Sequence, residues 1–257
     1  MSLTAHPGKP EPTTPNPPAE SGRAFLGILC WEEQGCPRGL VQLEEMIGNS
    51  TNPATYSFPV RFERVPGANL QSVVLSPNQQ VLHAMIESAN RLVDQGAKAI
   101  TTSCGFNAIF QKELANVLGV PVFTSSLLQI PLIRAMLGTD SRILVITASS
   151  VSLTETHFSA VGVTDLEGIV VAGLEQNREW RKIFEAPQVE INIERFRDDL
   201  IELATSFAND HQADALLLEC TDLPPFAEDI RKATRLPVFD FVSLVKFVDK
   251  SINFSAQ

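Results

Sequence analysis

Two cysteines occupy matching places in this sequence, and their thiols could carry acid–base chemistry. Cys104 lies in the stretch TTSCGFNAIF and Cys220 in LLLECTDLPPF, each between a strand-like apolar run and the start of a predicted helix. A thiol in such a place is either a packed core side chain or a group directed at a ligand. Helix N-termini lower the pKa of cysteine from its usual value of about 8.5, so both thiols are predicted to be poised for proton transfer.

The segments that must position these cysteines alternate between strands and helices. Strand-like runs occur at 24–30, 59–65, 97–103, 120–126, 141–150, 166–173, 214–219 and 236–241. Predicted helices begin at Ser76-Pro77, after Cys104, near Ser152 and after Cys220, and two more cover 193–207 and 243–252. The stretch from Trp31 to about Pro59 is predicted to be a long loop that acts as a lid or ligand loop.

This alternation predicts an α/β fold with mainly parallel sheets flanked by helices. In such sheets ligands bind beyond the carboxyl ends of the strands. Side chains that could do chemistry gather at those ends: Cys30, Cys104, Ser125, Thr147 and Cys220. We therefore expect the site there, with Cys30 either as a packing residue or as a support for the residues that contact the ligand, and Cys36 as an incidental loop residue.

An internal repeat relates the two cysteine motifs. A shift of 116 residues superposes Cys104 on Cys220, Phe110 on Phe226, and the PVF of 121–123 on that of 237–239. The repeat predicts two pseudo-symmetric lobes with the site in the cleft between them. We assign residues 1–22 to a disordered Pro-rich tail, 23–125 plus 237–257 to the first lobe, and 126–236 to the second.

Two thiols facing one cleft from opposite sides suit the inversion of a carbon centre, which needs a base on one face and an acid on the other. The developing carbanion would be stabilised by preorganised donors near a carboxylate or carbonyl. Candidate substrate-binding residues are Ser103, Gly105, Phe106, Ser126, Thr147, Thr221 and Asp222. This chemistry requires no metal and no organic cofactor, so none is predicted.

The segments ITTSCGFNAIFQKELANVLGVPVFTSSLLQIPLI and LLLECTDLPPFAEDIRKATRLPVFDF resemble the aspartate/glutamate racemase superfamily. That superfamily includes amino-acid and hydantoin racemases, a maleate isomerase and arylmalonate decarboxylases. The resemblance covers most of residues 24–252. It implies a cofactor-independent enzyme with two pseudo-symmetric lobes, in which Cys104 and Cys220 match the two catalytic cysteines.

The motifs also depart from the racemase pattern. Amino-acid racemases of the superfamily usually have Asn-Thr after the first cysteine, where this chain has Gly105-Phe106, and Gly before the second, where it has Glu219. Asp222 stands where an acidic partner is usual, and Cys30-Trp31-Glu32 ends the first strand. These differences leave the substrate open among amino acids, hydantoins and related small acids.

Composition excludes several other functions. The net charge of −10, without a block of Lys or Arg, argues against nucleic acid as a partner. The apolar runs fall far short of the ~20 residues of a membrane helix, so a cytoplasmic protein is predicted. The four cysteines lack zinc-site spacing. His83, His157 and His211 lie away from the cysteine motifs and are predicted to be surface residues, which disfavours a Cys–His hydrolase.

We therefore predict a cofactor-independent racemase or epimerase acting on a small carboxylate or hydantoin-like substrate. Two alternatives stay open: a maleate-type cis–trans isomerase with a covalent cysteine adduct, and a non-catalytic protein that binds a small acid. A homodimer or higher homo-oligomer is compatible with this size of chain.

Overall fold

Two four-stranded parallel sheets form the centre of the protein. This computed structural model describes residues 24–32 and 36–254, so the tail predicted at 1–22 lies outside the described residues. The first sheet has the order β2-β1-β3-β4 and the second β6-β5-β7-β8. The first contains β1 (Phe25–Cys30), β2 (Val60–Arg64), β3 (Ala97–Thr102) and β4 (Val122–Phe123). The second contains β5 (Ile143–Thr147), β6 (Ile169–Gly173), β7 (Ala215–Leu218) and β8 (Val238–Phe239).

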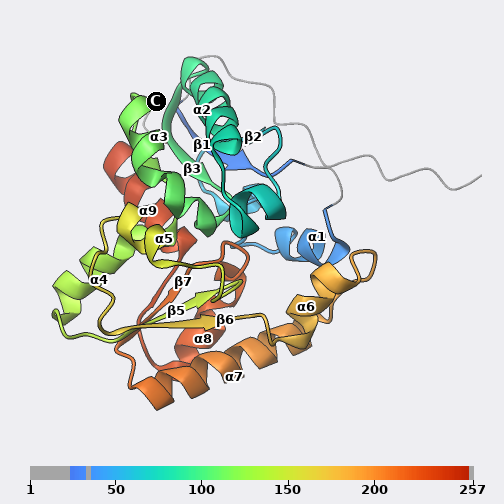
Figure 1. Cartoon of the computed structure of the whole chain (residues 1–257), viewed down its shortest axis with the longest axis vertical. Coiled ribbons are helices and arrows are strands. Elements are labelled where there is room, and N and C mark those ends of the chain that lie inside the picture. The colour runs from blue at the N-terminus through green and yellow to red at the C-terminus, as the bar shows by residue number, and fades with distance from the viewer. Residues whose placement is uncertain (1–23, 33–35, 255–257) are drawn as a thin grey trace, which may run out of the picture.

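Helices flank both sheets, as the alternation predicts (Figure 1). The α-helices are α1 (Arg38–Glu44), α2 (Gln79–Asp94), α3 (Gln111–Val117), α4 (Ile130–Leu137), α5 (Glu155–Ala160), α6 (Arg178–Glu185), α7 (Ile193–His211), α8 (Ala227–Thr234) and α9 (Phe241–Ile252). Shorter helical turns are η1 (Pro53–Thr55), η2 (Leu70–Leu75), η3 (Gly105–Phe110), η4 (Ser126–Gln129) and η5 (Pro224–Phe226). Within the described ranges, no helix is long and apolar enough to cross a membrane.

The predicted repeat is visible in the topology. The two sheets have the same strand order, and the predicted shift of 116 residues superposes the starts of α3 and α8 and the bounds of β4 and β8. The strand pairs are parallel in both sheets. The predicted α/β fold of two similar lobes is thus confirmed.

The chain returns to the first lobe one element later than the boundary at 237 implies. Strand β8 pairs with β7 in the second sheet, because Leu216 and Leu217 align with Val238 and Phe239. The following helix α9 packs Phe241 and other apolar residues into one cluster with β1 of the first lobe.

The long loop predicted after β1 contains a helix, α1, that packs on the second lobe. Leu40 and Leu43 of α1 belong to the same buried cluster as Ile183 of α6. Gly39 permits this approach, since a Cβ there would lie 2.7 Å from a side-chain carbon of Ile183. A seven-residue helix that contains a glycine has weak intrinsic propensity, which explains why the sequence pattern missed it.

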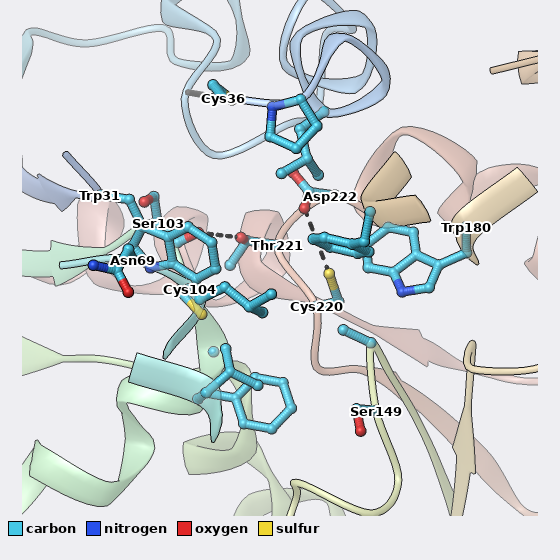
Figure 2. A pocket seen from close by; sticks show the side chains of 18 of the residues that line it. Trp31, Cys36, Asn69, Ser103, Cys104, Ser149, Trp180, Cys220, Thr221 and Asp222 are labelled. Carbon is cyan, nitrogen blue, oxygen red and sulfur yellow. Dashed lines mark hydrogen bonds between the residues drawn. The ribbon is translucent and has the colours of Figure 1, made fainter. Parts of the chain in front are cut away.

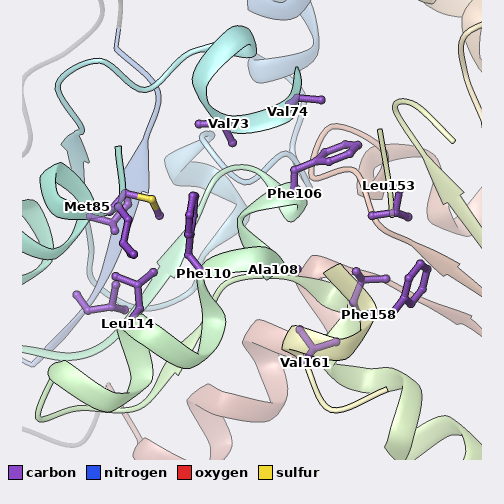
Figure 3. Packing of buried hydrophobic residues seen from close by; sticks show 14 of the residues in the cluster. Val73, Val74, Met85, Phe106, Ala108, Phe110, Leu114, Leu153, Phe158 and Val161 are labelled. Carbon is purple, nitrogen blue, oxygen red and sulfur yellow. The ribbon is translucent and has the colours of Figure 1, made fainter. Parts of the chain in front are cut away.

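A continuous apolar core joins the lobes behind the strand ends. One cluster extends from Met85 of α2 through Phe106 and Phe110 of η3 to Phe158 of α5 (Figure 3). It also includes Val145 of the second sheet. The turn that follows Cys104 is therefore held by packing on both sides.

The packing of α9 predicts a large difference between two phenylalanines on one helix. Phe241 is 1% exposed and Phe247 is 61% exposed. We expect Phe241→Ala to lower the free energy of unfolding by about 3–5 kcal/mol, and Phe247→Ala to change it by no more than about 0.5 kcal/mol. Urea denaturation of both variants measures the difference; equal losses would contradict the placement of α9 on β1.

Candidate active site

A cavity of about 540 Å³ lies at the carboxyl ends of the strands and is lined by both lobes. The first lobe contributes residues after β1 and β3, and the second contributes residues after β7 and from α6. Figure 2 shows Cys104 on the first-lobe side of this cavity and Cys220 on the second-lobe side. The structure thus brings the two repeat-related thiols to one cavity, as predicted.

The sulfur of Cys104 lies at the start of the 3-10 turn η3. The backbone N–H of Asn107 donates to the Cys104 carbonyl oxygen at 3.1 Å, and the N–H groups of Phe106 and Asn107 near the sulfur lower the pKa of the thiol. The Thr102 hydroxyl donates to the Cys104 carbonyl oxygen at 2.9 Å, and its oxygen lies 2.8 Å from the Thr124 carbonyl of the neighbouring strand end. Backbone donors and a buried threonine therefore fix the position of this thiol.

The sulfur of Cys220 lies beside a carboxylate. Cys220 Sγ donates to Asp222 Oδ2 at 3.7 Å, and Asn49 Nδ2 donates to Asp222 Oδ1 at 2.7 Å. Asn49 is fully buried and comes from the segment after α1. Asp222 therefore orients the Cys220 thiol and is itself held by an amide far away in sequence.

Glu219 lies behind the cavity wall with its side chain fully buried. The Thr147 hydroxyl donates to Glu219 Oε2 at 2.7 Å, whereas Oε1 has no hydrogen-bond partner among the described residues. Burial and the charge of Asp222 raise the pKa of Glu219 to about 7. The carboxyl packs on Gly105: a Cβ at that glycine would lie 2.2 Å from Oε1. The two departures from the racemase pattern are thus in contact with each other.

Direct hydrogen bonds tie the cysteine segments of the two lobes together. Thr221 Oγ1 donates to the Ser103 carbonyl at 2.5 Å (Figure 2), and Ser126 Oγ donates to the Leu218 carbonyl at 2.7 Å. Ser103, Gly105, Phe106, Thr221 and Asp222 line the cavity, and the substrate contact expected of them stays a prediction. Ser126 and Thr147 lie behind its wall and bind protein groups there, in contrast to the ligand contact predicted for them.

The pKa of both thiols is raised, whereas the sequence predicts that it is lowered. Burial, with the charges of Glu219 and Asp222, raises the pKa of the Cys104 thiol, and burial, with the same two acids, raises the pKa of Cys220. Backbone donors at the turn do lower the pKa of Cys104, but desolvation outweighs them. Burial likewise raises the pKa of Cys30, to about 12. The expected activation by the helix N-terminus is therefore overridden by burial.

Two further features of the cavity were not foreseen. Trp31, Trp180 and Phe184 give the cavity aromatic walls, and Trp180 stacks on Phe196 with centroids 5.9 Å apart. Glu175 lines the cavity and accepts a 2.7 Å hydrogen bond from the Ser150 backbone.

His157, predicted to be a surface residue, is 2% exposed, with its ring edge-on to Phe106 at 5.5 Å. It lies on α5, which packs against η3, and this lobe contact buries it. Isolated aromatic and histidine residues carry no local signal of such long-range contacts. Residues 24–32 and 36–254 contain no cluster of three His, Cys, Asp or Glu side chains that could hold a metal ion.

Comparison with known proteins gives two kinds of relatives, although no family model matches the chain. Dimethylsulfoniopropionate lyase from Durusdinium sp. clade D is 32% identical over 222 residues, which cover 81% of this chain and 72% of that protein. Dimethylsulfoniopropionate lyase 6 from Emiliania huxleyi is 31% identical over 209 residues, which cover 77% of this chain and 54% of that protein. The chain thus spans little more than half of the second relative.

Solved structures share the fold at lower identity. Allantoin racemase from Pseudomonas fluorescens has a TM-score of 0.59 at 18% identity, covering 90% of both chains. Aspartate racemase from Picrophilus torridus has a TM-score of 0.53 at 17% identity, covering 89% of this chain and 94% of that one. Unliganded arylmalonate decarboxylase has a TM-score of 0.54 at 16% identity, covering 91% and 94%. The fold implied by the two cysteine motifs is confirmed.

The contact between Gly105 and Glu219 predicts a steric effect. Gly105→Ala should lower the free energy of unfolding by about 1–3 kcal/mol, because the new methyl group overlaps both the side-chain carboxyl and the backbone carbonyl oxygen of Glu219. Gly119→Ala is the control, since a Cβ there meets nothing within 4 Å. Adding Glu219→Gly to Gly105→Ala should recover part of the loss in a double-mutant cycle. Strictly additive losses would show that the methyl group does not compete with the Glu219 side chain for space.

The raised pKa of Glu219 predicts a pH-dependent cost to stability. Between its usual value of 4.5 and about 7, the folded protein holds a proton that the unfolded chain has released. The stabilisation of the folded state by this protonated carboxyl is therefore complete below pH 4.5 and is lost as the pH rises through about 7.

We accordingly expect Glu219→Gln to gain up to about 3 kcal/mol relative to wild type between about pH 4.5 and about pH 8. Chemical denaturation across this range measures the gain. Glu228→Gln, which removes an exposed acid on α8, is the control and should show no rise. A difference independent of pH would mean that Glu219 stays ionised throughout.

Proposed function

The chain belongs to the dimethylsulfoniopropionate lyase family and has the fold of solved racemases, and from this we propose that it is a lyase that removes a neutral sulfide from a small β-sulfonio carboxylate. The sequence relatives and the structures of similar fold together support an enzyme of racemase fold that acts on a small acid. The site observation that carries the proposal is the pair of thiols lining one cavity, with a carboxylate bonded to one of them.

The reaction needs only one proton abstraction. A base removes a proton from the carbon next to the carboxylate, and the electron pair of that C–H bond forms the C=C bond. The C–S bond breaks, and its electron pair leaves with sulfur. Dimethylsulfoniopropionate then gives dimethyl sulfide, acrylate and a proton, with no oxidant or reductant. The reaction starts at the same position, next to a carboxylate, as the proton transfer predicted from the sequence.

We assign the base to the Cys220–Asp222 pair. Transfer of the thiol proton to Asp222 makes a thiolate without changing the net charge of the pair, so it avoids adding a charge to an acidic, buried region. Hydrogen bonds from Thr102 and Asn107 to its carbonyl oxygen hold Cys104 on the opposite side of the cavity. Its protonated thiol can then donate a hydrogen bond to the substrate carboxylate as negative charge develops.

The electrostatics of the cavity favour a substrate that carries a positive charge. Asp222 and Glu175 line the cavity, and the buried charges of Asp222 and Glu219 raise the pKa of both thiols. A bound sulfonium would offset this repulsion and favour the thiolate. The rings of Trp31 and Trp180, on two sides of the cavity in Figure 2, supply the faces that attract such cations.

The racemase or epimerase predicted from the sequence is the second candidate. The observation that favours it is the placement of Cys104 and Cys220 at repeat-related strand ends on the two sides of one cavity. In that reaction one thiolate removes the proton and the other thiol returns one to the opposite face of the carbon, so both cysteines exchange protons with the substrate.

The lyase proposal is tested with dimethylsulfoniopropionate and headspace gas chromatography of dimethyl sulfide. We expect release of dimethyl sulfide by the wild type, lowered about 10²–10⁴-fold by Cys220→Ser, since serine is a far weaker acid–base group. Cys104→Ser should lower release by about tenfold or more, through the lost hydrogen bond to the developing charge. Circular dichroism of each variant verifies that it is folded.

A parallel experiment separates the two candidates. Amino acids, hydantoins and 2-substituted dicarboxylic acids are incubated with the protein in D₂O and followed by proton NMR. Loss of the signal next to the carboxylate, abolished by either cysteine substitution, together with no release of dimethyl sulfide, would replace the lyase with the racemase. Dimethyl sulfide release without such exchange would support the lyase.

A further inference from the structure

The carboxyl of Glu219 is placed to control both thiols without touching a ligand. It is fully buried, does not line the cavity, and extends from the residue directly before Cys220. From the other lobe, Gly105 packs against it directly after Cys104. One acid side chain therefore lies at the contact between the two cysteine segments.

The environment of this carboxyl is incomplete for an ionised group. Oε2 accepts one hydrogen bond, from Thr147, while Oε1 lies against Gly105 without a partner among the described residues. A buried carboxylate is normally paired or accepts several hydrogen bonds. A protonated carboxylic acid carries no charge and needs fewer hydrogen-bond donors around it than a carboxylate does, so the site fits the neutral form better.

We propose that Glu219 is a positioning residue that stores a proton between the two cysteine segments and thereby sets the pH at which Cys104 and Cys220 can lose theirs. The titratable groups that face it are Asp222 and Cys220 on its own segment and Cys104 from the first lobe. The β5 side contributes Thr147, which does not titrate in this range.

The coupling has a definite direction. When Glu219 is neutral, a thiolate nearby faces only the charge of Asp222. When Glu219 is ionised, a second negative charge opposes the thiolate, and the pKa of both thiols rises. Burial raises the pKa of Glu219 to about 7, so this change falls in the neutral range. The four groups therefore titrate as one coupled unit.

The test measures the thiols directly. Alkylation of Cys104 and Cys220 of the full chain by iodoacetamide is followed by peptide mass spectrometry as a function of pH. Glu219→Gln keeps an amide oxygen for Thr147 and removes the charge, so we expect the alkylation midpoints of both cysteines to fall by about one pH unit. Glu219→Asp keeps an ionisable group, and its midpoints should stay closer to those of the wild type.

Glu228→Gln is the control, because it removes an exposed carboxylate on α8 that lies outside both the cavity lining and the contact of the two segments. Its alkylation midpoints should match the wild type. An equal fall in this variant, or unchanged midpoints in a folded Glu219→Gln variant, would overturn the proposal. A purely structural role would move the melting temperature and leave the midpoints in place.

If Glu219→Gln does not fold, infrared spectroscopy of the wild type decides. A protonated, buried carboxyl band should be present near pH 6 and disappear by about pH 9; its absence near pH 6 would overturn the proposal. The inference extends the proposed thiol chemistry, but neither measurement uses a substrate. Failure of the lyase assay therefore leaves the assignment of Glu219 intact, and the reverse also holds.

Discussion

The two halves of the site meet where Gly105 packs against Glu219, and the geometry of the cavity depends on that contact. A side chain at residue 105 would occupy the space of the carboxyl. Around this point, Thr221 bonds to Ser103 and Ser126 bonds to the β7 carbonyl of Leu218. The two thiols are consequently carried by segments that are bonded to each other, which fixes their relative position more firmly than two separate loops could.

The same contact places two carboxyl groups, Glu219 and Asp222, near the thiols. If both were ionised in these buried surroundings, their charges would strongly oppose the formation of a thiolate. Glu219, Asp222, Cys104 and Cys220 lie close enough for each ionisation to oppose the others. Such a cluster minimises its energy by holding few negative charges at a time. Basicity in this site is therefore a property of the cluster and of the ligand that enters it, and an isolated cysteine in the same turn would behave differently.

The sequence was sufficient for the fold and for the pairing of the two thiols. Alternating strands and helices indicated two parallel sheets, and the repeat placed Cys104 and Cys220 at equivalent strand ends. It could not foresee α1, a short helix stabilised by packing on α6, or the burial of His157. The predicted direction of the thiol pKa shifts was also wrong. The effect of a helix N-terminus can be read from the local sequence, whereas burial and the neighbouring Glu219 arise only from the tertiary fold.

The return of the chain to the first lobe has a consequence for how the protein is made. One apolar face of β1 is buried by α9, which begins at Phe241. Nearly the whole described chain therefore lies between this strand and its covering helix in the sequence. During synthesis the second lobe, built from consecutive segments, can form its sheet before α9 has been translated. The first lobe is the first to be synthesised and the last to be completed. Until α9 docks, one apolar face of its sheet is exposed on the nascent chain.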